Sequence, residues 1–212
     1  DSNSIFVSDG GGNTFFSSLQ NINLKKGQRS ITSGGSGCMG SGIPQAIGAA
    51  LSGEKKVFCF IGDGSMQFNI QELQTIKHHN LDITIFLINN SGYQAIIDTQ
   101  NSYFNGNKFG VDKESGLSLP NFEKVVKAYE ISYELFSSDY QLSEKEIQRL
   151  CLKNKNPKVI EILVKPNTPM FPTLSSGKKD EYTLMKKLPG IVSMDPQLPN
   201  KTYENLLKIK SW

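Results

Sequence analysis

The chain has 212 residues, of which 37% are hydrophobic and 20% charged, a composition typical of a globular protein with an apolar core. Its formal net charge is only +3, and it lacks a long basic run, which argues against a nucleic-acid partner. No apolar stretch approaches about 18 residues, so we expect no membrane-spanning helix. The three cysteines have no CxxC spacing, which argues against a disulfide framework and favours the cytoplasm.

Short apolar runs rich in β-branched and aromatic residues indicate strands. In chain order they cover 5–7, 57–61, 83–88, 132–136 and 159–164. Segments of helical length lie between them, at 13–24, 44–51, 67–79, 121–129 and 143–153. This alternation predicts an α/β fold of three layers, with a mostly parallel sheet and helices on both faces.

The alternation ends near Lys165, and a polar segment with several prolines follows to Trp212. We therefore expect an α/β domain over residues 1–165 and an extended C-terminal tail over residues 166–212. The chain begins without methionine and runs almost at once into a predicted strand. This favours a piece of a longer protein over a separate natural subunit.

Two polar turns follow neighbouring predicted strands. One is Gly62-Asp-Gly-Ser65 and the other is Asn89-Asn-Ser-Gly92. Parallel strands that lie side by side end at the same edge of the sheet, so Asp63 and Asn90 are expected to meet there. A carboxylate, an amide oxygen and the carbonyl of Gly92 form an all-oxygen set, which suits Mg²⁺ with phosphates at its remaining positions. The glycines of both turns allow the main chain to approach those phosphates closely.

A GDG motif followed by NN after the next strand resembles the signature of thiamine-diphosphate enzymes. By that resemblance Asp63, Asn90 and the carbonyl of Gly92 bind the metal. The resemblance covers roughly residues 1–165 and implies thiamine diphosphate and Mg²⁺ as cofactors.

The glycine-rich segment 32–50 resembles the part of acetolactate-synthase-like enzymes that meets the aminopyrimidine ring of the cofactor. By that resemblance the carbonyl of Gly37 accepts from the 4′-amino group, and Met39 is the apolar wedge that bends the cofactor for reaction. Cys38 lies beside these contacts, and its alternative interpretation is a small buried thiol. The other residues expected to contact the cofactor are Gly12, Asn13, Thr14, Gly62, Gly64, Ser65, Gly92, Tyr93 and Gln94. For the last two, a helix-capping role is equally open.

Two alternatives stay open. Residues 35–40 also read G-x-G-x-x-G, and Asp63 follows at a spacing that suits a ribose-binding acid, which predicts a Rossmann-type NAD-binding domain of an oxidoreductase. That reading leaves Asn90 and Gly92 unexplained, and its preceding strand, 29–32, is weak. The second alternative is a binding module without catalysis.

The resemblance implies a lyase or transferase of the acetolactate-synthase-like branch that decarboxylates or ligates a small 2-oxo acid. Authentic acetolactate synthases carry Gln-Trp where this chain has Asp98-Thr99, so another acceptor, such as a keto-sugar nucleotide, is open. The family also needs a glutamate from a pyrimidine-binding domain as general acid and base, and no part of this sequence resembles that domain. We therefore expect that domain on the same or another chain, a homo-oligomer (dimer or tetramer), and no turnover by the isolated chain.

Overall fold

The computed structural model describes residues 3–11, 14, 18, 21–53, 56–137, 143–152 and 155–168, and the main chain of 173–174 and 194–195. The chain divides into two compact units, Asp1–Thr168 and Pro169–Trp212. In the second unit, β7 (Thr173–Leu174) pairs antiparallel with β8 (Met194–Asp195). The predicted domain boundary after residue 165 stays a prediction.

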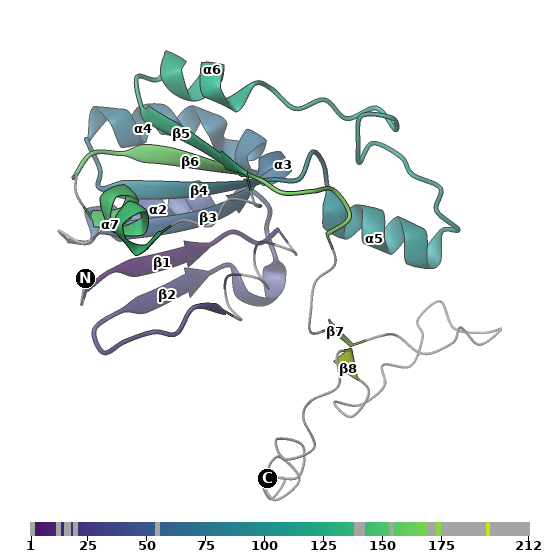
Figure 1. Ribbon diagram of the computed structural model, residues 1–212, viewed down its shortest axis with the longest axis horizontal. Helices are drawn as coiled ribbons and strands as arrows, with labels where there is room; N and C mark the ends of the chain where they lie inside the picture. Colours follow the sequence, from purple (N-terminus) through teal and green to yellow (C-terminus); the bar gives the residue numbers. More distant parts are fainter. Residues whose placement is uncertain are drawn as a thin grey trace, which may run out of the picture. The chain divides into compact units, whose positions relative to one another are not determined.

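The first unit is built on one sheet of six strands in the order β2-β1-β3-β4-β6-β5. The strands are β1 (Ile5–Ser8), β2 (Arg29–Thr32), β3 (Val57–Gly62), β4 (Ile83–Asn89), β5 (Ser132–Ser137) and β6 (Lys158–Leu163). Every neighbouring pair is parallel, so all six arrowheads point to the same edge (Figure 1). Each predicted strand is confirmed, with ends that differ by at most one residue, and the weak candidate over 29–32 is also a strand.

Helices lie on both faces of this sheet, with α7 in front of it and α2 and α4 behind it in Figure 1. The described helical elements are η1 (Gly34–Ser36), α2 (Gly42–Leu51), α3 (Asp63–Met66), η2 (Gln67–Glu72), α4 (Leu73–His78), α5 (Gln94–Tyr103), α6 (Phe122–Ala128) and α7 (Glu144–Leu152). The expected three-layer α/β fold with a parallel sheet is confirmed. Half of the expected helix over 13–24 lies outside the described residues; Thr14, Ser18 and Asn21 are helical, whereas residues 22–24 are described and are not helical, so the expected end of the helix is wrong.

Side chains alternate between the two faces of each strand, which divides the apolar residues of β3 and β4 into two sets. The set that includes Val57 and Ile85 belongs to the main core cluster, together with Ile43 of α2, Ile76 of α4 and Val126 of α6. These five side chains are at most 1% exposed. Full burial of one such side chain contributes about 1.5–3 kcal/mol, so this layer carries much of the stability of the domain.

The opposite face of the same strands carries aromatic side chains. Phe58 of β3 stacks on Phe6 of β1 with ring centroids 5.4 Å apart, and Phe60 stacks on Phe86 of β4 at 5.1 Å. The register places the members of each pair on adjacent strands of the sheet. Both faces of the central strands are thus apolar, as the continuous runs of the sequence predicted.

The single helix expected over residues 67–79 is wrong. Helical geometry already begins at Asp63, changes to a 3₁₀ helix at Gln67 and is interrupted at Asn69, whose φ and ψ are −136° and 34°. The side chain of Asn69 donates to the carbonyl of Gly40 at 2.9 Å. A hydrogen bond to the neighbouring loop therefore accompanies the kink, and the apolar pattern of one segment does not reveal such a bond.

Capping interactions begin two of the predicted helices. Asn121 caps α6 by accepting from the N–H of Lys124 at 2.9 Å. Before α7, Glu146 accepts from the N–H of Ser143 at 2.9 Å, and Ser143 accepts from the N–H of Glu146 at 3.3 Å. Ser143 and Glu146 thus form a capping box at the start of α7.

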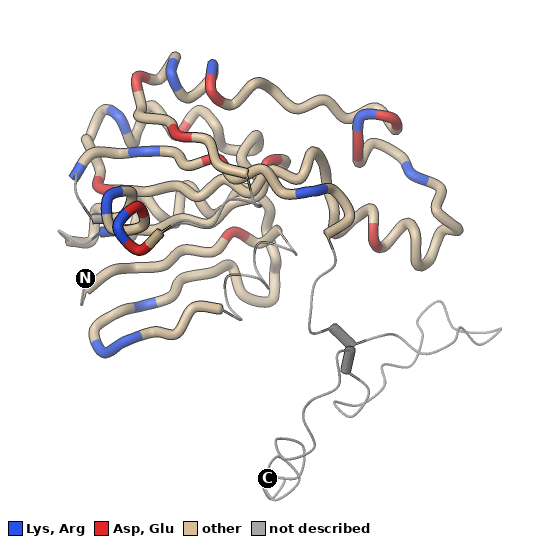
Figure 2. The backbone as a smooth tube through the Cα atoms, viewed as in Figure 1, with Lys and Arg blue, Asp and Glu red and all other residues tan. Residues whose placement is uncertain are grey.

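Acidic and basic residues are interspersed along the described backbone rather than gathered by sign (Figure 2). Among the residues described, no helix combines the length and the apolar character that crossing a membrane requires.

Candidate functional site

The two polar turns lie side by side at the carboxyl edge of the sheet. Strands β3 and β4 are neighbours, and their register pairs Gly62 with Ile88. Immediately beyond them, one carboxylate oxygen of Asp63 accepts from the N–H groups of Asn90 and Gly92, at 3.1 and 3.2 Å. The predicted meeting of the two strand ends is confirmed.

Asp63 is the electrostatic centre of this edge. Its other oxygen accepts from the N–H of Gly64 at 2.6 Å. Asp63 is almost fully buried, with only 2% of the residue exposed. Burial raises the pKa of this carboxyl to about 6, while the surrounding main-chain N–H groups act in the opposite direction. A buried carboxylate is costly unless a cation or hydrogen bonds compensate it, so the site has a preference for positive charge.

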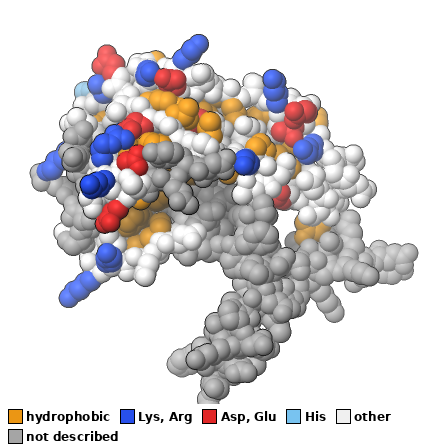
Figure 3. All heavy atoms as spheres, viewed as in Figure 1, with side chains coloured by type: hydrophobic (Ala, Val, Ile, Leu, Met, Phe, Trp, Pro, Cys, Tyr) orange, Lys and Arg blue, Asp and Glu red, His pale blue; other side chains and the backbone are white. Residues whose placement is uncertain are grey.

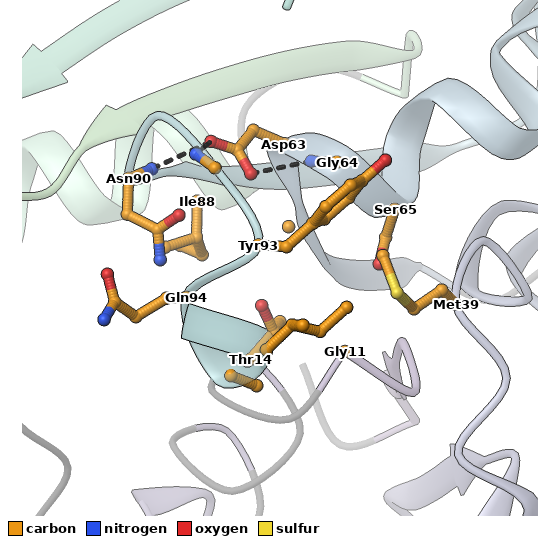
Figure 4. Close-up of a pocket in the computed structure, with 14 residues that line it drawn as sticks. Gly11, Thr14, Met39, Asp63, Gly64, Ser65, Ile88, Asn90, Tyr93 and Gln94 are labelled. Carbon is orange, nitrogen blue, oxygen red and sulfur yellow. Dashed lines mark hydrogen bonds between the residues drawn. The ribbon is translucent and has the colours of Figure 1, made fainter. Parts of the chain in front are cut away.

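A pocket opens beside Asp63 (Figure 4). It is lined by Gly11, Thr14, Met39, Gly62, Asp63, Gly64, Ser65, Ile88, Asn90, Gly92, Tyr93, Gln94, Ala95 and Ile96. Among these lining residues, Asp63 is the one with a charged side chain. An anionic ligand therefore finds no basic side chain in the described lining.

Most residues expected at the site line this pocket, but some do not. Gly37 and Cys38 are absent from the described lining, and Gly12 and Asn13 lie outside the described residues. The sequence reasoning missed the apolar lining that Ile88 and the first turn of α5 supply. The helix expected to begin at Tyr93 and Gln94 is α5, but the sequence did not indicate its extent, because QAIIDTQNSY is largely polar.

The glycines of the two turns have a packing role that the sequence did not indicate. A Cβ atom on Gly64 would lie 2.0 Å from the ring of Tyr93, which covers this turn in Figure 4. A Cβ atom on Gly92 would lie 2.5 Å from the carbonyl oxygen of Val111, which accepts from the N–H of Tyr93 at 2.9 Å. Only glycine lets the turn after β4 lie this close to the segment around Val111.

The second glycine-rich loop brings Met39 to the pocket. Gly37 has a φ of +55° and closes the turn η1 by donating to the carbonyl of Gly34 at 3.3 Å. Met39 follows, and its thioether lies near Ser65 in Figure 4. Cys38 is exposed, so the expectation of a small buried thiol is wrong; the turn directs this side chain outward, where its sulfur lies 3.4 Å from the hydroxyl of Ser36.

Asp9 organises the site although the sequence reasoning did not single it out. It is fully buried after β1, and its carboxylate accepts from the N–H of Gly11 at 3.1 Å and of Gly42 at 2.8 Å. Gly42 is the first residue of α2, so Asp9 joins the first glycine-rich loop to the start of that helix. Its position was the available signal in the sequence, because Asp9, like Asp63, is an acidic residue that follows a predicted strand.

Gln94 lines the pocket, but its amide is already engaged. The Nε2 atom donates to Asp98 at 2.8 Å and to the side chain of Asn167 at 3.3 Å. Its oxygen accepts from the N–H of Asn167 at 2.9 Å. These bonds tie α5 to the segment after β6 and do not cap the helix; the contact of Gln94 with phosphate stays a prediction.

The donor set at this edge fits a hard divalent cation. Within the described residues, no three His, Cys, Asp or Glu side chains gather to form a metal site, and Asp63 supplies the one carboxylate in the described lining of this pocket. A carboxylate offers about four acceptor positions, and three of those of Asp63 are used by N–H groups. The amide of Asn90 lies on the pocket side of its turn (Figure 4) and adds a neutral oxygen of the kind Mg²⁺ accepts.

The strand order bears on the dinucleotide-binding alternative. In that fold the glycine-rich turn and the ribose-binding acid follow two neighbouring strands. Here β2 precedes the glycine-rich loop and β3 precedes Asp63. Because β1 lies between these two strands, they are not neighbours, unlike the corresponding strands of the dinucleotide-binding fold.

The parallel α/β sheet, with a pocket at the carboxyl ends of adjacent strands, defines a cofactor-binding domain of the α/β class. The chain belongs to the thiamine pyrophosphate enzymes: the family model described as "Thiamine pyrophosphate enzyme, C-terminal TPP binding domain" matches residues 10–162.

Similar proteins support this assignment. The chain is 34% identical over 187 residues to the acetolactate synthase large subunit of Buchnera aphidicola subsp. Schizaphis graminum, covering 87% of this chain and 32% of that protein. It is 31% identical over 180 residues to the acetolactate synthase isozyme 1 large subunit of Escherichia coli K12, covering 84% and 31%. The chain thus spans about a third of the length of the curated relatives it matches.

A solved structure shows the same fold. The thiamine diphosphate-dependent 4-hydroxybenzoylformate decarboxylase of Rhodococcus jostii RHA1 superposes with a TM-score of 0.64 at 21% sequence identity. The match covers 79% of this chain and 30% of that one.

Proposed function

We propose that the pocket at the ends of β3 and β4 holds the diphosphate of thiamine diphosphate through Mg²⁺. The side chains of Asp63 and Asn90 and the carbonyl of Gly92 would supply the protein ligands. The observation that carries the proposal is the buried carboxylate of Asp63, which is 2% exposed and lines a pocket whose described lining has no basic side chain. A diphosphate would be repelled by this carboxylate alone, whereas a divalent cation between them satisfies both charges.

The start of α5 adds a second source of attraction for phosphate. Gln94, Ala95 and Ile96 of its first turn line the pocket. The first N–H groups of a helix have no partner within the helix, and its N-terminal end is partly positive. The N–H of Ile96 already donates to the carbonyl of Tyr93 at 2.9 Å, so a diphosphate held by the cation would also be stabilised by the N–H groups of Gln94 and Ala95.

The chain would contribute the cofactor-binding part of an acetolactate-synthase-like enzyme acting on a 2-oxo acid. Bound thiamine diphosphate supplies the electron sink for breaking and making the bond next to a ketone. The residues of this chain would bind and orient it: Asp63 and Asn90 fix the diphosphate, and Met39 fills the space against the rings. The carbonyl of Gly37 would hold the amino group of the pyrimidine.

The complete active site would need a further domain. We propose that a pyrimidine-binding domain, on the same or another chain of a homo-oligomer, supplies the glutamate that acts as general acid and base. Large apolar side chains are exposed in the described part of the chain, including Phe68, Phe104 and Phe109. On the face shown in Figure 3, apolar side chains lie between charged ones, a pattern compatible with such a partner. The isolated chain is expected to bind the cofactor without turning over 2-oxo acids.

Calorimetric titration tests the binding proposal. The 212-residue chain is titrated with thiamine diphosphate in Mg²⁺ and again in EDTA, and with NAD as a control ligand. We expect binding only with thiamine diphosphate and Mg²⁺, and its loss in Asp63→Ala. Glu123→Gln, which removes a carboxylate from an exposed ion pair of α6, should bind as the wild type does. Equal binding in EDTA, or unchanged binding by Asp63→Ala, would refute the proposal.

A further inference from the structure

A buried glutamate in the sheet has no part in the site described so far. Glu161 lies in β6 and is only 5% exposed. Strand β6 is flanked by β4 on one side and β5 on the other. Burial of a carboxylate in a sheet is unfavourable unless strong hydrogen bonds compensate it, and both neighbouring strands supply one.

The two partners hold the two oxygens of Glu161 separately. Tyr133 of β5 donates its hydroxyl to one oxygen at 2.6 Å, and Asn89 at the end of β4 donates its amide to the other at 2.6 Å. The registers place all three side chains on the same face of the sheet. Burial, and to a smaller extent the hydrogen bond to Glu161, raises the pKa of the Tyr133 hydroxyl. This hydroxyl therefore remains a donor at neutral pH.

The side chain of Asn89 connects Glu161 to the turn that contains Asn90. Its side-chain oxygen accepts from the N–H of Ser91 at 3.0 Å. Because an N–H group can only donate, the oxygen of the Asn89 amide must face Ser91, and its NH₂ group must then face Glu161. Ser91 has a φ of +65°, a left-handed conformation that costs a non-glycine residue about 1 kcal/mol or more and needs support from its surroundings.

The geometry points to Glu161 as a positioning residue for the cation-binding turn. It orients Asn89, Asn89 holds Ser91 in its left-handed conformation, and this conformation directs Asn90 and Gly92 toward Asp63. This inference rests on the proposed function, because it assigns the turn to a cation and a diphosphate. The residue acts from strand β6 through Asn89 and has no direct contact with the ligand.

The variants separate this role from simple support of the fold. Glu161→Leu removes both hydrogen bonds, and Asn89→Ala removes only the connection to the turn. Glu161→Gln keeps an oxygen for Asn89 and offers an NH₂ group to the oxygen of Tyr133. Glu134→Gln is the matched control, because this glutamate of β5 pairs with Arg149 instead.

Two measurements on the 212-residue chain are combined. One is the affinity for thiamine diphosphate in Mg²⁺, and the other is the exchange rate of the Ser91 amide hydrogen in the metal-free chain, followed by NMR. Glu161→Leu and Asn89→Ala should each weaken binding and speed up exchange by about 5- to 10-fold, the effect of one lost hydrogen bond. The double variant should be no worse than the more affected single one, because both changes break the same connection. Glu161→Gln and Glu134→Gln should stay within about twofold of the wild type.

Unchanged binding and unchanged Ser91 exchange in Glu161→Leu, or additive effects in the double variant, would overturn the inference. If Glu161→Leu does not fold, Glu161→Asp replaces it, because a carboxylate one methylene shorter cannot reach both partners. Absence of Mg²⁺-dependent binding in the wild type would refute the proposed function, while exchange at Ser91 would still show whether Glu161 holds the turn.

Discussion

The carboxylate of Asp9, at the end of β1, accepts a hydrogen bond from the N–H of Gly42, the first residue of α2, at 2.8 Å. The same carboxylate accepts from Gly11 in its own loop. Two loops that are distant in sequence are therefore held at one edge of the sheet by a side chain that is 0% exposed.

Replacement of Asp9 tests this connection. Asp9→Ala leaves the N–H of Gly42 without its partner, and a lost hydrogen bond to a charged group lowers the free energy of unfolding by about 1.5–3 kcal/mol. Asp9→Asn keeps one oxygen for Gly42 and should lose about half as much. Urea denaturation measures both values. Equal stability of Asp9→Ala and the wild type would show that the hydrogen bond to α2 has no net effect.

Gly92→Ala tests the close approach of the turn after β4. The added Cβ would lie 2.5 Å from the main-chain oxygen of Val111, so the turn must shift away from Asp63. We expect the affinity for thiamine diphosphate in Mg²⁺ to fall by at least about tenfold, because the cation ligands are displaced by a fraction of an ångström or more. Gly48→Ala is the control: that glycine lies in α2 with open space around it, and its replacement should stabilise the chain by about 0.5–1 kcal/mol without altering affinity. Wild-type affinity in Gly92→Ala would contradict the packing described for the turn.

The stability of the metal-free chain should depend on pH through Asp63. Its pKa is raised by burial from an ordinary 3.8 to about 6 in the folded chain, so between these values the folded state binds more protons than the unfolded state. The free energy of unfolding therefore falls as the pH rises through this window and levels off above it, by about 2–3 kcal/mol in total. Urea denaturation in EDTA from about pH 4 to 7 measures the slope. Asp63→Asn should lack this contribution, and an identical slope in both proteins would contradict it.

Met39→Ala separates the ring contacts from the diphosphate contacts. If Met39 packs against the rings, its truncation should weaken binding of thiamine diphosphate by about tenfold, in keeping with the loss of a buried apolar side chain. Binding of inorganic pyrophosphate in Mg²⁺ should not change. Calorimetric titration with both ligands compares them. An equal loss for pyrophosphate would place Met39 at the diphosphate instead.

The parallel sheet and the meeting of Asp63 with Asn90 could be predicted because both depend on local patterns. Apolar runs mark the strands, and a polar turn after each of two neighbouring strands must come to the same edge. The alternative interpretation of Cys38 as a buried thiol was wrong because the direction of its side chain depends on the left-handed turn at Gly37, which a run of glycines does not specify.

The supporting contacts could not be read from the sequence. The bond of Glu161 to Asn89 depends on the register of β6 against β4, and the bond of Asp9 to Gly42 depends on how two loops pack. The kink at Asn69 likewise follows from a contact with a loop that is distant in sequence. The apolar pattern of each segment involves other residues, so it carries no information about the contacts that these polar side chains make.

A crystal structure of the chain grown with thiamine diphosphate and Mn²⁺, in which anomalous scattering locates the cation, tests most directly whether Asp63 and Asn90 hold the metal. We expect a cation coordinated by an oxygen of Asp63 and by the side-chain oxygen of Asn90, with phosphate oxygens at remaining positions. A cation or diphosphate bound away from Asp63, or bound with Asn90 turned out of the site, would contradict it.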